Sequence, residues 1–478
     1  MLNKIPEGYF TSSMSVLIYA ALSFACGNNR GLILMIEKVI VENFQSSDEE
    51  VFYYAIKAIS STSQDVGLRI DLVKKALERV DSDTSAMILA YAHLVYAQLL
   101  TTACDYIKAE IEYKYAVKKF GQSKAYFLET MTFTNYAIFN NLKGKHKKVI
   151  RESRQFLNEK GTIFENFNKY NCMVEMVLGA AYKNIGKVAI AKKTLESAMR
   201  DIYKLELVHM YAYPFYELFE CLIIMHSNDE IMKHVETFTQ AVSQLNDENI
   251  SLFIHYTDIY LALKYDKIPE KSDIEAFEIA CSYANDSGMI NYLELALELK
   301  LLNLSDLFNI DDLRKKYERS NYMELKLESA KCSALFLKWY DANGFIDEAK
   351  AYCLELLEKC LDIGNVFLLI KYKTLIRKYI KYIPEKVATD VDELYPAFNG
   401  DLINKGISNP YDLTERELDV LSLISEGMSN KDVAMKLYIS VGTVKWHLNN
   451  LYGKMNVKSR YEAIVIAKEK GILNNKLK

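Results

Sequence analysis

The sequence predicts an all-α protein, in which a long stack of helical hairpins is followed by a small four-helix module. Glycine and proline are scarce, with 18 Gly and 6 Pro among 478 residues, whereas average usage is about 7 and 5 per cent. Tight turns depend on these two residues, so a β-sandwich, a β-barrel or a linker-rich disordered chain is disfavoured. Half of the residues are hydrophobic, which is ample for large cores. The length indicates about three domain equivalents, or one repeat array plus a module.

The first helical segment is similar in length to the core of a signal peptide. Residues 14–25 read MSVLIYAALSFA, and the residues before them carry one Lys and one Glu. A signal peptide would have a positive cluster there, and twelve apolar residues are too few to span a bilayer. We therefore expect a buried helix of the first repeat, in a cytoplasmic protein that does not enter the membrane.

Small residues recur at a fixed spacing in the long part of the chain. The clearest copy, in residues 176–199, contains Leu178, Gly179, Tyr182, Ala191, Leu195 and Ala198. Intervals of twelve and then seven residues return at Ala97, Ala109 and Ala116, at Leu337, Ala349 and Leu356, and more weakly at Ala137, Val149 and Phe156. This is the spacing of tetratricopeptide repeats, in which small residues let the two helices of a hairpin approach closely. We expect an α-solenoid whose period is longer than the usual 34 residues, with a poorer match in residues 200–330.

A solenoid of this kind has a concave groove, and such grooves bind peptides or protein segments. The chain contains 34 tyrosines, and a tyrosine-rich groove would suit peptide recognition. For any single tyrosine, the simpler interpretation is a half-buried position on a hairpin helix. We expect residues 1–394 to bind a regulatory protein, peptide or small ligand, or to mediate oligomerisation.

A break in composition follows the repeats. Pro384, Pro396 and Pro410 are half of all the prolines, and Gly400 and Gly406 lie in the same stretch. This clustering predicts a linker at 395–411 and a separate domain at 412–474.

Capping signals divide this domain into four helices. Thr414–Glu417 and Ser459–Glu462 have the capping-box pattern, Ser429 and Ser440 precede the second and third helices, and Gly427 and Gly471 mark helix ends. Apolar residues at helical spacing predict one small core, formed by Leu418, Leu421, Leu423, Ile424, Val433, Ala434, Leu437, Val444, Leu448, Leu451 and Met455. Only Tyr438 and Ile439 separate the second and third helices. This predicts a helix-turn-helix, whose second helix can lie in the major groove of DNA.

The third helix has a polar face opposite its apolar one. Gly442, Lys445, Trp446 and Asn449 stand at i, i+3, i+4 and i+7, so they should point away from the core. A lysine can donate to guanine O6 and N7, and an asparagine can pair with adenine N6 and N7.

The stretches LTERELDVL, GMSNKDVA, ISVGTVKWHLNNLYGKM and VKSRYEA resemble the LuxR-type (GerE-like) DNA-binding domain of bacterial transcription regulators, over about residues 413–473. In that family the positions that match Lys445, Trp446 and Asn449 face base edges. Trp446 is less usual there; it packs against a thymine methyl group or is a surface aromatic with no reading role. We expect phosphate contacts, which position the domain without specifying sequence, from Asn430, Lys431, Thr443, His447, Lys454 and Lys458.

The resemblance also implies that the fourth helix pairs two copies of the domain on a two-fold DNA site. The residues concerned are Ala463, Ile464, Ile466 and Ala467, and packing within one chain is the alternative.

Signals for catalysis, metals and cofactors are absent from the sequence. The eight cysteines form no C-x-x-C, no H-x-x-x-H pair occurs, and no G-x-x-x-x-G-K-[ST] phosphate loop is present. We therefore expect no enzyme and no cofactor. The chain is similar to the repeat and DNA-binding parts of maltose-regulon-activator-type regulators, without their ATPase.

The net charge of −4 hides an uneven distribution. Residues 411–478 carry eleven basic and eight acidic side chains, and the other 410 residues carry 48 and 55. A mildly basic module on an acidic body suits attraction to phosphates at one end. The sequence thus predicts a regulator that binds double-stranded DNA as a homodimer at the nucleoid, with RNA polymerase as a further candidate partner. The alternative is a tetratricopeptide adaptor whose helix-turn-helix is not a DNA reader.

Overall fold

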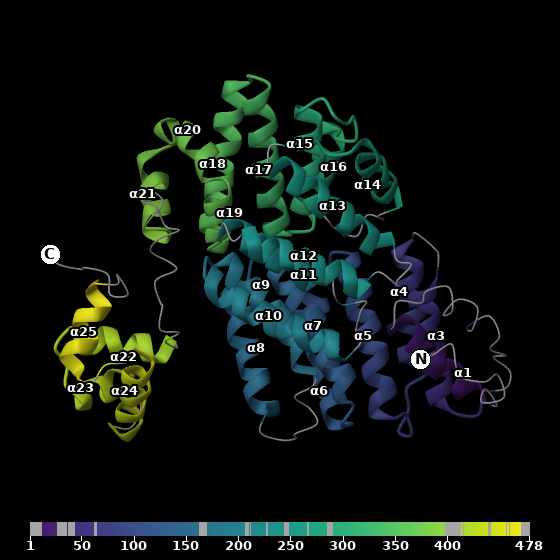
Figure 1. Cartoon of the computed structure of the whole chain (residues 1–478). Helices are drawn as coiled ribbons and strands as arrows, with labels where there is room; N and C mark the ends of the chain where they lie inside the picture. Colours follow the sequence, from purple (N-terminus) through teal and green to yellow (C-terminus); the bar gives the residue numbers. More distant parts are fainter. Residues whose placement is uncertain are drawn as a thin grey trace. The chain divides into compact units, whose positions relative to one another are not determined.

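The computed structural model is helical throughout the part of the chain that it describes, and it contains no strand there (Figure 1). Two compact units are present, residues 1–394 and residues 395–478. The predicted all-α class is confirmed. The structure describes the whole chain except residues 1–11, 26–35, 37–43, 62–64, 162–169, 206–209, 211, 226–227, 243–247, 265–266, 284–289, 397–412, 414, 438–440, 456, 458 and 470–478.

The first unit begins with helices that bury the segment similar to a signal peptide. Helix α1 (Ser13–Ala25) packs on α3 (Ser47–Ser60), and Leu17 and Ala20 of α1 are fully buried. Helix α4 (Val66–Glu78) completes this group. Among the described residues, no helix is long and apolar enough to cross a membrane.

Three hairpins follow, of which the first and third are closely packed, and they carry the repeat predicted from the sequence. They are α5 (Ala86–Thr102) with α6 (Tyr106–Gln122), α7 (Tyr126–Leu142) with α8 (His146–Gly161), and α9 (Asn171–Asn184) with α10 (Val188–Lys204). Ala97, Ala109 and Ala116 are fully buried between their helices. A Cβ at Gly179 would lie 2.5 Å from Leu195 Cγ, so only glycine permits this approach. The prediction that small residues bring the hairpin helices together is confirmed.

The region that matched the repeat poorly continues the stack with a different packing. It contains α11 (Ala212–Ile224), α12 (Asn228–Val242), α13 (Glu248–Lys264), α14 (Lys271–Tyr283), α15 (Ile290–Leu301) and α16 (Ile310–Tyr322). Aromatic rings fill the interior here: the rings of Phe215 and Phe238 stack with centroids 3.8 Å apart, and Phe219 lies edge-on to Tyr260 at 5.4 Å. Large rings replace the small residues, which is why the small-residue spacing fades between 200 and 330.

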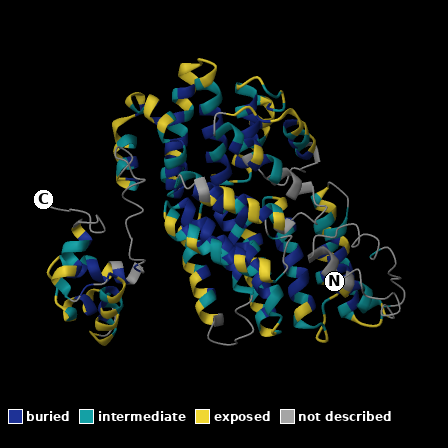
Figure 2. Cartoon of the chain, in the orientation of Figure 1, coloured by how far each residue is buried: buried dark blue, intermediate teal, exposed yellow. Residues whose placement is uncertain are grey.

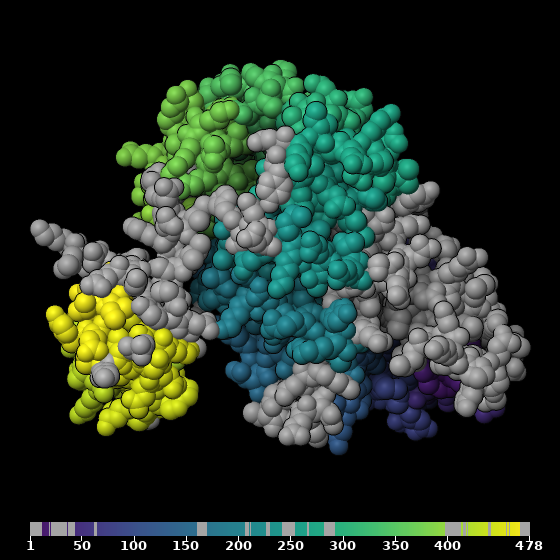
Figure 3. Space-filling model, in the orientation of Figure 1, coloured from purple at the N-terminus to yellow at the C-terminus, as the bar shows by residue number. Residues whose placement is uncertain are grey.

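The last helices of the unit are α17 (Lys326–Ala342), α18 (Ile346–Ile363), α19 (Val366–Lys371), α20 (Lys373–Tyr379), the 3₁₀ turn η6 (Ile380–Tyr382) and α21 (Glu385–Leu394). They pack back onto the middle of the stack, since α17 contacts α7 and α19 contacts α9. A Cβ at Gly144 would lie 2.4 Å from Ile363 Cγ2, and one at Gly186 would lie 2.6 Å from Val366 Cγ1. The end of α18 thus packs against the hairpin turn at Gly144, and the start of α19 packs against the turn at Gly186. In the space-filling view, the teal and green parts of this unit adjoin one another (Figure 3).

A buried charge cluster lies in this contact. The Nζ atom of Lys183 on α9 is 2.7 Å from Glu217 Oε2 and also meets Glu220, both on α11. The Nζ atom of Lys371 on α19 is 2.8 Å from Glu220 Oε1 and 2.6 Å from Glu294 Oε2 on α15. Burial alone would lower the pKa of both lysines, but the neighbouring carboxylates outweigh it and the pKa values are raised. Both lysines therefore stay charged and connect four helices.

The second unit is a separate four-helix domain. Its helices are α22 (Glu415–Ser425), α23 (Asn430–Leu437), α24 (Val441–Met455) and α25 (Arg460–Glu469). The predicted core residues from Leu421 to Met455 pack together, with Leu437 partly buried, and Leu413, Val420 and Val457 join them. Dark blue marks the buried residues inside each unit (Figure 2). The side chain of Leu418 lies outside the described residues.

Local capping positions the domain's helices. The Ser429 hydroxyl accepts from the Asp432 amide at 3.3 Å, and Asp432 Oδ2 accepts from the Ser429 amide at 3.2 Å. Ser459 likewise caps α25 by accepting from the Glu462 amide. Gly427 has φ +86° at the end of α22, a conformation that favours glycine. The other predicted caps and stops, Thr414, Ser440 and Gly471, lie outside the described residues, as do Tyr438, Ile439 and most of the predicted linker 395–411.

Candidate nucleic-acid interface and solenoid cavity

Helix α24 has two chemically distinct faces. Val444 and Leu451 are fully buried and Leu448 nearly so, which fixes the helix on the domain core. Lys445 and Asn449 are exposed on the other face, and Trp446 is 61% exposed. Gly442, in the first turn of the helix, is exposed as well. An ammonium group, an amide and an indole are therefore exposed together on the outer face of this helix.

The residues predicted to contact phosphates differ in their exposure. Lys431 is exposed, and Asn430, Thr443 and His447 are half-buried. The His447 ring lies edge-on to the Trp446 ring, with centroids 4.9 Å apart, so the histidine supports the indole. Lys458 lies outside the described residues.

Lys454 has a partner within the domain. Its Nζ atom is 2.8 Å from Glu417 Oε2, and Glu417 is 3% exposed. A buried carboxylate without a cation would be strongly destabilising. Lys454 therefore neutralises Glu417, and a contact with phosphate would compete with this ion pair.

Helix α25 contributes to the domain core. Ala463 and Ala467 are fully buried in it, and Ile464 and Ile466 are partly buried against it. The two alanines cannot meet a second copy in this structure, because the domain's own side chains cover them. Ile464 and Ile466 remain partly accessible, and Tyr461 is exposed.

Arg460 is a structural residue that the sequence pattern did not reveal. Its guanidinium donates to the backbone carbonyls of Ile424, at 3.0 Å, and of Met428. These carbonyls belong to the end of α22 and the turn that leads to α23, so Arg460 fixes α25 against the helix-turn-helix. The capping box Ser459–Glu462, which contains Arg460, indicates only the start of a helix. The sequence does not reveal the partners of Arg460, because they are more than thirty residues away along the chain.

Residues 412–467 match the family described as bacterial regulatory proteins, LuxR family. These residues form a LuxR-type domain. Over 61 residues the chain is 41% identical to the HTH-type transcriptional regulator AlkS of Pseudomonas putida, which is 13% of this chain and 7% of AlkS. Over 54 residues it is 54% identical to the nitrate/nitrite response regulator protein NarP of Escherichia coli, which is 11% of this chain and 25% of NarP.

The expected similarity to the maltose-regulon activator type is confirmed for a short part of the chain. The HTH-type transcriptional regulator MalT of Vibrio campbellii is 41% identical over 78 residues, 15% of this chain and 9% of MalT. The chain covers less than half the length of each of these relatives. The likeness therefore identifies the LuxR-type domain and not the whole molecule.

The chain also resembles a solved helical-repeat protein. The crystal structure of a Rap protein complexed with Competence and Sporulation Factor superposes with a TM-score of 0.51, covering 74% of this chain and 99% of that one. The sequences are 12% identical, so this likeness concerns the fold alone.

The first unit contains a cavity of about 980 Å³. Helices α5, α6, α7, α9 and α11 form one side of it, and α14, α15, α16 and α17 contribute the other. The return of α17 to α7 is what brings these two groups of helices together. The cavity thus lies between parts of the chain that are about 200 residues apart, and the repeat spacing alone does not predict it.

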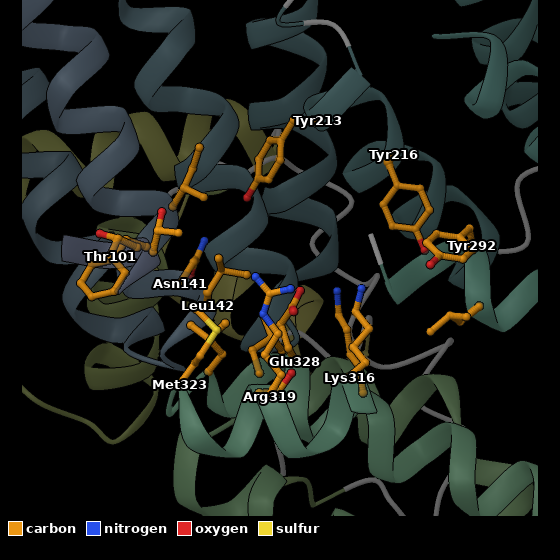
Figure 4. Close-up of a pocket in the computed structure, with 18 of the residues that line it drawn as sticks. Thr101, Asn141, Leu142, Tyr213, Tyr216, Tyr292, Lys316, Arg319, Met323 and Glu328 are labelled. Atoms are coloured by element: carbon orange, nitrogen blue, oxygen red, sulfur yellow. The ribbon is translucent and has the colours of Figure 1, made fainter. Parts of the chain in front are cut away.

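The two walls of the cavity differ in chemistry. Lys315, Lys316 and Arg319 lie on one face of α16, and Lys331 on α17 joins them. Across the cavity are tyrosines and side-chain amides, among them Tyr213, Tyr216 and Asn141. Figure 4 shows Lys316, Arg319 and Glu328 extending from the lower helices toward these residues.

Burial and neighbouring charges perturb several groups in the walls. Burial raises the pKa of Tyr113 to about 12, and burial followed by the charge of Glu217 raises that of Tyr213 well above its ordinary value. Burial also raises the pKa of Glu328, although Lys331, Lys316 and Arg319 oppose the effect. At neutral pH the tyrosines are therefore neutral hydrogen-bonding groups.

Proposed function

We propose that this chain is a non-enzymatic transcription regulator that reads the major groove of double-stranded DNA with α24. The observation that carries the proposal is the exposed face of Lys445, Trp446 and Asn449 on a helix whose opposite face forms the core of a LuxR-type domain. Lysine and asparagine have the donors that base edges require. Trp446, supported by His447, offers an apolar surface for a thymine methyl group.

The remaining surface of the domain would position it on DNA. Lys431, Asn430 and Thr443 are the described candidates for phosphate contacts, to which the N-terminus of α24 adds backbone amides. Pairing of two domains through Ile464 and Ile466 would give a homodimer on a two-fold site. RNA polymerase is a further candidate partner of such a dimer, and the site of action would be the nucleoid in the cytoplasm.

The helical repeats would supply the regulatory signal by binding a peptide, a protein segment or a small ligand in the 980 Å³ cavity. Two observations support this role: the cavity has the size of a ligand site, and the fold resembles that of a Rap protein solved in a complex with Competence and Sporulation Factor. A ligand can control DNA binding only if it prefers one of two states of the protein.

The test is selection of double-stranded fragments of the organism's own genome on the full chain, followed by affinity measurements at increasing salt. Binding driven by phosphate contacts should weaken linearly on a log–log scale as salt rises. Failure to bind any fragment at low salt would favour the adaptor alternative, in which the helix-turn-helix contacts protein. Removal of residues 1–395 should change the affinity or its response to ligand if the repeats regulate the domain.

A further inference from the structure

The cavity in the first unit has a basic wall that is built by helical periodicity. Asp312, Lys315, Lys316, Arg319 and Met323 stand at i, i+3, i+4, i+7 and i+11, and all five line the cavity. One face of α16 and its C-terminal end therefore point into the space. That face carries three cations and one carboxylate, and the carboxylate, Asp312, is 3.2 Å from Lys315 Nζ.

A fourth cation and a buried carboxylate lie behind this face. Lys331 is half-buried on α17, and Glu328, one turn earlier, is 8% exposed. The charges of Lys331, Lys316 and Arg319 all act on Glu328. Three cations thus act on one carboxylate, so this part of the wall has a net positive charge that suits a second carboxylate.

The opposite wall contains polar atoms that are buried without a described partner. Among the described residues, neither Gln98 Oε1 nor the Tyr106 hydroxyl has a hydrogen-bond partner, and both residues line the cavity. Tyr106 is 7% exposed and stacks on Phe139, with centroids 5.2 Å apart. Buried polar groups are normally hydrogen-bonded, so this wall suits a ligand with its own amide donors and acceptors beside apolar groups.

The size of the space favours an extended ligand. A volume of about 980 Å³ is at the upper end of the range for small-molecule sites, roughly 300–1,000 Å³. The cavity reaches from Gln98 on α5 to Lys331 on α17, so a ligand that contacts both walls must extend across it.

We infer that the cavity binds a short peptide in extended form, with a carboxylate of the peptide on Lys316, Arg319 and Lys331 and its backbone amides on the wall of Gln98 and Tyr106. This inference rests on the proposed ligand-binding role of the repeats, and it specifies the chemistry of the ligand. Charge-assisted hydrogen bonds from arginine and lysine are the strongest contacts that a carboxylate can receive. The carboxylate belongs either to the C-terminus of the peptide or to an Asp or Glu side chain.

The probes that test the inference are three sets of randomised seven-residue peptides, used with the full chain. The first set has a free C-terminus and lacks Asp and Glu, the second has a C-terminal carboxamide and includes Asp and Glu, and the third has a carboxamide and lacks both acidic residues. Peptides retained by the protein are identified by mass spectrometry, resynthesised with a fluorescent label and titrated by anisotropy. We expect binders in the first or second set, which identifies the source of the carboxylate, and at least tenfold weaker binding when that carboxylate is converted to an amide.

Matched variants locate the carboxylate on the basic wall. Lys316→Gln with Arg319→Gln removes two cations that line the cavity, and Arg314→Gln with Lys326→Gln removes two cations of the neighbouring surface that do not line it. The first variant should bind the acid and amide forms of a peptide equally, whereas the second should keep the tenfold preference. Circular dichroism of both variants verifies that they remain folded.

Three results would overturn the inference: retention of no peptide from any set, equal binding of acid and amide forms by the unmodified protein, or an undiminished preference in the Lys316→Gln/Arg319→Gln variant. DNA affinity is measured in the same preparations. If the unmodified chain binds DNA but shows no carboxylate preference, this inference alone is contradicted, whereas absence of DNA binding contradicts the proposed function.

Discussion

At the scale of single residues, the LuxR-type domain separates residues that hold the fold from the exposed residues that we propose read DNA. On α24 the buried Val444 and Leu451 alternate with the exposed Lys445 and Asn449. The helix cannot rotate to hide its polar face without exposing the apolar one. The hydrophobic core therefore fixes the orientation of the proposed reading face.

Replacement of Lys445 and Asn449 by alanine should reduce sequence preference. Each well-placed contact with a base edge contributes about 1–3 kcal/mol of discrimination, so the double variant should bind selected and unrelated DNA with similar affinity. Lys436→Ala is the matched control, because Lys436 lies on α23 and pairs with Glu426 at 3.6 Å. Competition binding with both DNAs measures the effect; a double variant that retains the wild-type preference would show that another surface reads the bases.

His146 should make the first unit sensitive to acid. The residue is 1% exposed, its Nδ1 is 2.9 Å from Asn141 Oδ1, and burial followed by the charges of Lys183 and Lys331 lowers its pKa to about 3. An unfolded histidine has a pKa of about 6.5, so between these two values the unfolded state binds the extra proton. The free energy of unfolding should therefore fall as the pH drops below about 6.5, by about 2 kcal/mol between pH 7 and pH 5 from this residue.

Urea unfolding at pH 7 and pH 5 measures this linkage, with the His146→Gln variant as the comparison. The variant starts from a lower stability but should lose about 2 kcal/mol less over the same pH interval. An equal loss in both proteins would mean that His146 is protonated in the folded state. His234, whose pKa is lowered to about 4 by burial, should contribute in the same direction and remains in both proteins.

The sequence predicted which residues of α24 face outward, because a 3.6-residue period assigns faces directly. It did not separate Lys454 from the candidate phosphate contacts, since its partner Glu417 is 37 residues away. It left open whether Ala463 and Ala467 contact a second copy or pack within one chain, and both are buried in the domain's own core. Periodicity identifies an apolar face but not the surface that covers it.

At the scale of elements, glycines at hairpin turns have two different roles. Gly144, Gly186 and Gly344 have φ of +74°, +79° and +78°, which favours glycine at each position. A Cβ at Gly344 would meet nothing within 4 Å among the described atoms, whereas a Cβ at Gly144 would collide with Ile363. The sequence shows the same kind of loop at residues 140–145 and 340–345, and only the fold distinguishes them.

The substitutions Gly144→Ala and Gly344→Ala should therefore differ in cost. Each introduces a left-handed alanine, at about 1–2 kcal/mol. Gly144→Ala should cost about 1–3 kcal/mol more, because it forces apart two packed elements. Urea unfolding compares the variants, and Ile363→Ala added to Gly144→Ala should recover part of the difference through a double-mutant cycle. Equal costs would show that α18 does not rest on this turn.

The hairpins themselves were predicted well, because close helix pairs need small residues at regular intervals and these are local signals. The stretch from 200 to 330 could not be assigned in the same way, since stacked aromatic rings satisfy the same packing requirement without a fixed spacing. Phe215, Phe219 and Phe238 are each fully buried there. A packing requirement that several residue types can meet leaves a weaker pattern in the sequence.

At the scale of the whole first unit, closure of the stack depends on contacts between distant segments. Tetratricopeptide-type stacks are stabilised mainly by contacts between neighbouring repeats. Here, by contrast, Lys371 is 151 residues from Glu220 along the chain and 77 from Glu294, and it binds both. The same closure brings the basic wall of the cavity opposite the tyrosine wall, so the proposed ligand site depends on it.

Replacement of Lys371 by methionine should therefore be strongly destabilising. The substitution leaves Glu220, which is 4% exposed, with Lys183 as a cation partner and removes the ion pair between Lys371 and Glu294. Loss of one partner of a buried ion pair costs about 3–5 kcal/mol. Lys378→Met is the matched control, because Lys378 lies on the next helix and pairs with Asp341 at 2.8 Å while 60% exposed. An exposed pair contributes about 0–1 kcal/mol. Urea unfolding of both variants, followed by circular dichroism, gives the comparison.

Adding Glu294→Gln to Lys371→Met should restore part of the lost stability, because it removes the unpaired carboxylate. Equal stability of the two lysine variants would show that the charge cluster does not hold the stack closed.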